Sequence, residues 1–88
     1  MQLKTMPWNE DIWQAFLRAA AYIPPPVRME AVTLVVEQSE ARARARGSER
    51  VEEPDLMASA AEKVPRAYRR VSLQVLQEQG LKLPEERR

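Results

Sequence analysis

Apolar side chains recur three to four residues apart along most of this 88-residue chain, which is the spacing of one face of a helix. The first such run follows Asn9, a good N-cap, and must end before Pro24, because the residue preceding a proline disfavours helical backbone. Trp8 and Trp13 take the positions of a hydrophobic staple. The apolar positions of this first predicted helix are Ile12, Phe16, Ala19, Ala20 and Ile23.

A second and longer helix is predicted over residues 27–46, with Gly47 as its stop. Val32 and Val36 lie outside its main apolar face, so we expect the middle of this helix to be buried on more than one side. Its main face consists of Val27, Ala31, Leu34, Val35, Gln38, Ala41 and Ala45.

The remaining pattern predicts a third helix that begins near Pro54 and a fourth that ends at Gly80. Pro65 either ends the third helix or opens the fourth. Residues 81–88 read as a tail. We therefore predict one small all-α domain over residues 1–88: a long antiparallel helical hairpin with a third helix and a short fourth at about 65–80.

Composition narrows the chemistry. The chain has no histidine and no cysteine, so it lacks the commonest general base and the commonest ligands of transition metals. Its serines have no partner of the kind that activates a nucleophile. No apolar run reaches the length of a membrane span. We expect a cytoplasmic protein that is not an enzyme, with no catalytic residues, no metal and no cofactor.

Three charged clusters have a structural reading. We interpret Glu52, Glu53 and Asp55 as charge stabilisation of a helix N-terminus. The net charge is only +1, and glutamates surround the arginine-rich end of the second helix, which favours a salt-bridged face over nucleic-acid binding there. That end carries Arg42, Arg44, Arg46 and Arg50. A second basic cluster consists of Arg66, Arg69 and Arg70; Tyr68 among them could stack on a nucleic-acid base, but we expect it in the core or at its edge.

The link between the first two helices is the candidate contact site. Pro24, Pro25, Pro26 and Val27 form a stiff corner, because proline fixes its own backbone angle and lacks an N–H donor. Arg28 follows directly. Its guanidinium either closes the corner on the carbonyls at the end of the first helix or is presented to a partner, and both hypotheses stay open.

This arrangement resembles the small C-terminal helical domain of the B subunit of light-independent (dark-operative) protochlorophyllide reductase, which also occurs as short free-standing proteins. The resemblance covers residues 8–64 and is most specific in Ile-Pro-x-x-Val-Arg, here residues 23–28. Two segments are each about four residues longer than the family spacing, one before and one after the corner. The other matching positions are Trp8, Glu40, Gly47, Val51, Leu56 and Ala60.

The resemblance implies an accessory or docking role near a tetrapyrrole enzyme. Everything catalytic in the reductase lies outside the matched positions, as does the segment after Pro65. A protein partner or self-association is expected. A nucleic-acid-associated protein and a self-associating structural protein are the alternatives.

Overall fold

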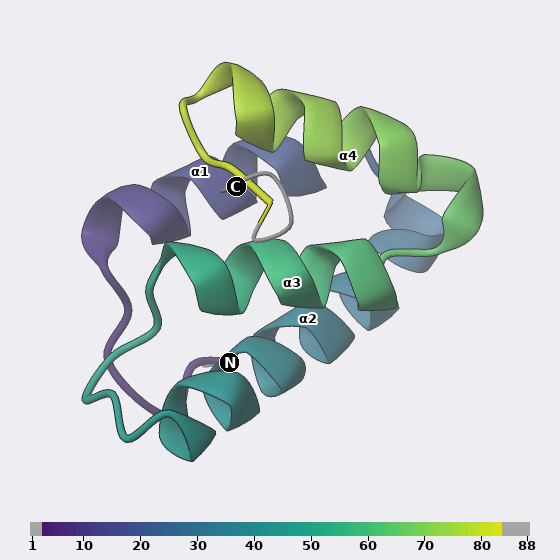
Figure 1. Cartoon of the computed structure of the whole chain (residues 1–88). Coiled ribbons are helices and arrows are strands. Elements are labelled where there is room, and N and C mark those ends of the chain that lie inside the picture. Colours follow the sequence, from purple (N-terminus) through teal and green to yellow (C-terminus); the bar gives the residue numbers. More distant parts are fainter. Residues whose placement is uncertain (1–2, 84–88) are drawn as a thin grey trace.

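The computed structural model describes residues 3–83, which form four helices (Figure 1). These are α1 over Glu10–Ala20, α2 over Pro25–Ala45, α3 over Glu53–Lys63 and α4 over Arg66–Glu78. Within the described residues, extended backbone pairs only at an isolated parallel bridge between Trp8 and Val51. The predicted all-α class with four helices is confirmed.

The helices do not pack in the order in which they follow one another. The most extensive contacts lie between α2 and α3, followed by those between α1 and α4. From the proline corner α1 and α2 diverge, and α3 lies in the space between them (Figure 1). The predicted hairpin is therefore an open one, because its arms bury their apolar faces against the second half of the chain.

Most predicted helix ends are correct to within a few residues. The Asn9 side chain caps α1 by accepting hydrogen bonds from the amides of Asp11 and Ile12. The proline corner is shorter than predicted, since only Pro24 has extended backbone and Pro25 already begins α2. Pro65 precedes α4 as its N-cap. Of the predicted tail, Leu81 and Leu83 pack against the core, and residues 84–88 lie outside the described part.

One core joins all four helices. As predicted, α2 is buried on more than one side, with Val32, Val35 and Val36 all less than 9% exposed. Leu34 was expected to face the core but is 39% exposed, because the core side of α2 follows those valines instead. The other buried apolar residues include Trp8, Ile12, Phe16, Ile23, Val51, Leu56, Met57, Val64 and Leu76.

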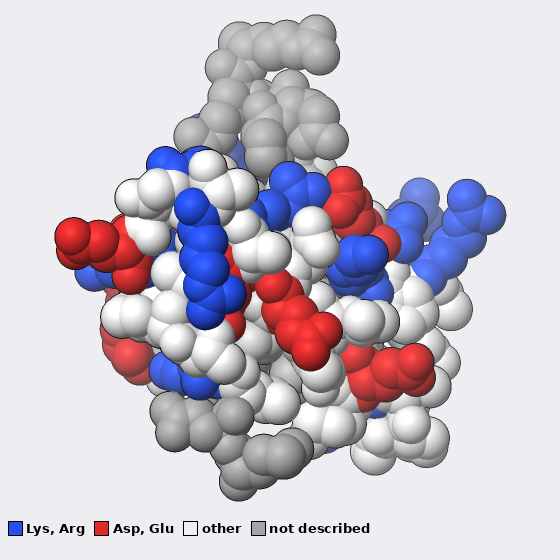
Figure 2. Space-filling view, turned by 90° about the horizontal axis from the view of Figure 1, so that it is seen from below, with Lys and Arg blue, Asp and Glu red and all other residues white. Residues whose placement is uncertain are grey.

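On the surface, basic and acidic side chains alternate over most of the face shown in Figure 2. Such interspersed charges leave that face without a large area of one sign. Among the described residues, no helix combines the length and the apolar character needed to cross a membrane.

Candidate functional site: two corners closed by arginines

The first corner is closed by Arg28. Its Nε donates a hydrogen bond to the carbonyl of Ile23 at 2.9 Å, and its Nη2 donates to the carbonyl of Ala21 at 3.3 Å. Carbonyls at the end of a helix have no partner within the helix, and a cation there also suits the helix dipole. The guanidinium of Arg28 thus satisfies the end of α1 and ties it to the first turn of α2.

The second corner has the same construction. Arg69 donates from Nε and Nη2 to the carbonyl of Val64, at 3.1 and 2.9 Å, and from Nη2 to that of Glu62 at 3.3 Å. Pro65 has φ −53° and ψ 142°, against −56° and 142° at Pro24. Each proline carbonyl accepts a hydrogen bond from the amide three residues later.

These two corners belong to one structural unit that the chain contains twice. A shift of 41 residues carries Ile23 onto Val64 and Arg28 onto Arg69. It also pairs buried positions along the flanking helices: Ala15 with Leu56, Phe16 with Met57, Ala19 with Ala60, Ala31 with Ser72 and Val35 with Leu76. Exchanging the two units turns the α2–α3 pair into the α4–α1 pair, which are the two most extensive helix contacts.

Sequence analysis singled out Arg28 and its corner but missed the second copy. The available signal was the pattern of an aliphatic residue, a proline and then an arginine, at 23, 24 and 28 and again at 64, 65 and 69. The residues between them differ, so this short pattern is a weak signal, and the equivalence of the flanking helices appears when burial and hydrogen bonds are compared.

A buried carboxylate, that of Glu40, anchors the segment before α1. It is 2% exposed and accepts hydrogen bonds from the Thr5 hydroxyl at 2.6 Å, the Thr5 amide at 3.0 Å and the Trp8 indole at 2.9 Å. Burial alone raises the pKa of Glu40, but the Thr5 and Trp8 hydrogen bonds and the charge of Arg44 outweigh it, so the pKa lies below 4.5. The sequence indicates Glu40 as an i,i+4 partner of Arg44 and as a matching position of the family resemblance, but not as a buried carboxylate.

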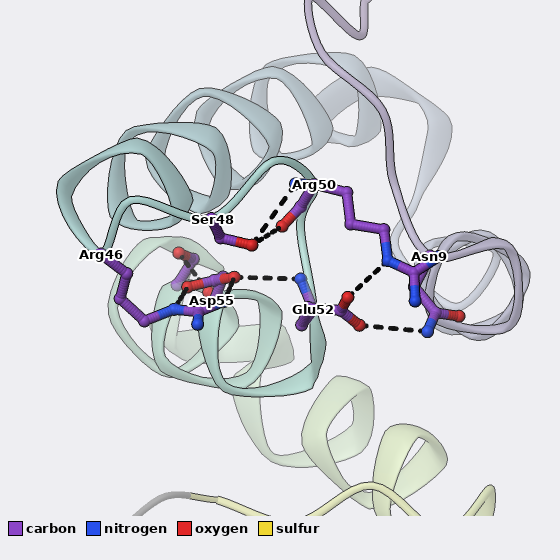
Figure 3. Close-up of polar contacts among 7 residues, drawn as sticks. Asn9, Arg46, Ser48, Arg50, Glu52 and Asp55 are labelled. Atoms are coloured by element: carbon purple, nitrogen blue, oxygen red, sulfur yellow. Dashed lines mark hydrogen bonds and ion pairs between the residues drawn. The ribbon is translucent and has the colours of Figure 1, made fainter.

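A second polar cluster joins the end of α2 to the start of α3 (Figure 3). Arg46 donates two hydrogen bonds to the carboxylate of Asp55, at 2.9 and 2.6 Å, and Asp55 accepts a third from the Glu52 amide at 2.9 Å. Glu52 in turn accepts hydrogen bonds from Arg50 and from the side chain of Asn9. The Asp55 carboxylate therefore stabilises the N-terminus of α3, in line with the interpretation of this cluster, although it is more deeply buried than expected, at 2% exposed.

The arginines at the end of α2 form the salt-bridged face that sequence analysis favoured. Arg42 pairs with Glu62, Arg44 with Glu40, Arg46 with Asp55 and Arg50 with Glu52.

Trp8 and Trp13 pack edge to face with ring centroids 5.0 Å apart, as expected of a staple. The described residues contain no group of three or more acidic side chains arranged to hold a metal ion.

A depression of about 330 Å³ lies between α1 and the end of α4. Two of its polar side chains bond to each other and to the backbone: Arg18 donates to the side-chain oxygen of Gln79 at 2.6 Å, and Gln79 donates to the carbonyl of Val75. The depression brings together no nucleophile and base. It is lined by Asp11, Gln14, Ala15, Arg18, Gln79 and Leu81.

Comparisons with protein-family models, with curated proteins and with solved structures find no match to this chain.

Proposed function

We propose that this chain is a non-catalytic docking domain that binds a protein partner through the side chains flanking its first corner. The observation that carries the proposal is exposure. Tyr22 and Met29 are 54% and 57% exposed, more than any other large apolar residue of the described part. One directly precedes Ile23 and the other directly follows Arg28, so both flank the corner that Arg28 closes.

Rigidity favours binding at such a place. The prolines and the Arg28 hydrogen bonds fix the backbone on which Tyr22 and Met29 stand, which lowers the conformational entropy lost on association. Exposed aromatic and methionine side chains are also enriched at protein interfaces. In this proposal Arg28 positions the contact residues, and its own guanidinium stays on the carbonyls of Ala21 and Ile23.

The resemblance to the protochlorophyllide reductase domain supplies the biological context of the proposal, in which the partner belongs to a tetrapyrrole enzyme. The polar clusters support a non-catalytic role, because the buried carboxylates of Glu40 and Asp55 bind groups of the fold itself.

The test is a pull-down from cell extract with the immobilised full chain, read by quantitative mass spectrometry. We expect proteins retained by the wild type to be lost with Tyr22→Ser/Met29→Ser and kept with Leu17→Ser/Leu34→Ser. The control residues are also exposed, at 42% and 39%, and Leu34 is about 140° around α2 from Met29. Equal retention by both double variants would contradict the proposal. Tetrapyrrole enzymes among the lost proteins would support the context, and their absence would count against it.

A further inference from the structure

Both corners lie at one end of the molecule. α1 and α3 begin side by side, where the Asn9 side chain donates to Glu52 at 3.1 Å and Trp8 bridges to Val51. Each helix has 11 residues, and both run in the same direction in Figure 1. Their C-terminal ends, where the corners start, therefore face the same way.

Free positive charge gathers at this end. Three exposed residues, Lys63, Arg66 and Arg70, flank the second corner, and their side chains have no hydrogen bond or ion pair to another described residue. Residues 21–30 and 62–71 together contain five basic and two acidic side chains, and one of the two, Glu62, is paired with Arg42. Basic side chains also project from the right-hand edge of Figure 2, the side on which Figure 1 places the corners.

The opposite end is different. There three basic side chains, those of Arg44, Arg46 and Arg50, each have a carboxylate partner at the same end. Pairing of that kind serves the fold, whereas the cations at the corner end have no such role in the described part. We call the exposed set at this end the corner face; it consists of Tyr22, Met29, Lys63, Arg66 and Arg70.

We infer that the corner face binds an acidic segment of a partner protein that also carries apolar side chains. This inference rests on the proposed function and adds the chemistry of the partner. Carboxylates of the segment meet the three unpaired cations, and its apolar side chains cover Tyr22 and Met29. Complementary charge of this kind orients a partner and speeds association. Nucleic acid fits less well, because three cations displace few counterions and two exposed apolar side chains remain uncovered.

The test uses the full chain and a fluorescent 14-residue helical peptide with leucines along one face and glutamates elsewhere. We expect the peptide to bind the wild type with an affinity that falls as salt is added. We expect the affinity to be about tenfold or more lower in Lys63→Glu/Arg66→Glu/Arg70→Glu. The charge-conserving control Lys63→Arg/Arg66→Lys/Arg70→Lys should bind within about twofold of the wild type. Circular dichroism melts check that each variant is folded, and glutamine at the same three positions replaces any reversal variant that does not fold.

Other probes name the outcomes that would overturn the inference. The first is that a peptide with lysines in place of the glutamates binds as tightly as the glutamate peptide. The second is that a 20-base-pair DNA duplex or phosphatidylserine vesicles bind more tightly than the glutamate peptide. The third is that the glutamate peptide does not bind. Dimerisation in sedimentation that the charge-reversal variant abolishes would make a second copy the occupant and would also overturn it. If leucine peptides bind whatever their charge and need only Tyr22 and Met29, the inference fails and the proposed function stands. If glutamate peptides bind without need of Tyr22 or Met29, the proposed contact fails instead.

Discussion

At the scale of single residues, Glu40 decides how the segment before α1 is held. Its carboxylate is buried and receives three hydrogen bonds from Thr5 and Trp8, which lie more than 30 residues away along the chain. A buried carboxylate that lost these donors would be strongly destabilising. The charged carboxylate of Glu40 therefore stabilises the fold. The sequence of α2 suggests only a surface ion pair between Glu40 and Arg44.

This gives a prediction on pH. Because hydrogen bonds lower the folded-state pKa of Glu40 below 4.5, its contribution to the free energy of unfolding is present above that value and is lost as the pH falls through the folded pKa. We expect Glu40→Gln to lower the free energy of unfolding by about 1–3 kcal/mol at pH 7. The gap to the wild type should narrow as the pH falls below 4.5 and through the folded pKa of Glu40, because the carboxylate then becomes protonated. Urea unfolding of both proteins at several pH values measures this difference in the free energy of unfolding.

Glu37→Gln provides the control, since Glu37 is exposed on the same helix and should alter stability little at any pH. A gap between Glu40→Gln and the wild type that does not narrow at any acidic pH at which both proteins stay folded would show that the charge of Glu40 is not what holds Thr5 and Trp8.

Prediction from sequence succeeded where a residue acts through its neighbours in the chain. The cap at Asn9 and the stop at Gly47, which has φ +75°, follow from local rules. The partners of Glu40 and the bidentate contact of Arg46 with Asp55 depend on how separate segments meet. Rules that use only neighbouring residues cannot predict that Glu40 and Arg46 bond to these side chains and not to water.

At the scale of elements, the corners set the directions of the helices. Each corner is closed by an arginine that donates to carbonyls at or just after the end of the preceding helix. α1 and α2 diverge from the first corner, whereas α3 and α4 stay in contact beyond the second. Helix periodicity predicted the four helices correctly. It could not predict that α3 fills the space between α1 and α2, because periodicity gives the apolar face of a helix and not the helix that covers it.

The equivalence of the corners predicts matched effects. We expect Arg28→Ala and Arg69→Ala each to lower the free energy of unfolding by about 0.5–2 kcal/mol, through loss of charge-assisted hydrogen bonds. Lysine should restore little at either position, because it cannot reproduce the forked donors. The two effects should add, since the arginines share no partner. Thermal and urea unfolding of the single and double variants measure this.

Arg70→Ala is the matched control, because Arg70 neighbours Arg69 but has no partner in the described part, and it should change stability by less than about 0.5 kcal/mol. A destabilised Arg28→Ala beside an unaffected Arg69→Ala would refute the equivalence of the two corners. An unaffected Arg28→Ala with weakened partner binding would restore Arg28 as a contact residue.

At the scale of the whole molecule, the two ends have different roles in this account. One end joins the segment before α1, the end of α2 and the start of α3 through Glu40, Asp55 and their donors. The other end has corners closed from within and leaves its apolar and basic side chains exposed. Side chains at both ends stabilise the fold, and binding is proposed only at the end that carries the corners.

The most direct test of this division is a nuclear magnetic resonance titration of the ¹⁵N-labelled full chain with the leucine–glutamate peptide. We expect the backbone amide shifts of the non-proline residues in 21–30 and 62–71 to change, and those around Glu40 and Asp55 to stay unchanged. Changes concentrated around Glu40 and Asp55, or spread evenly over the chain, would contradict it.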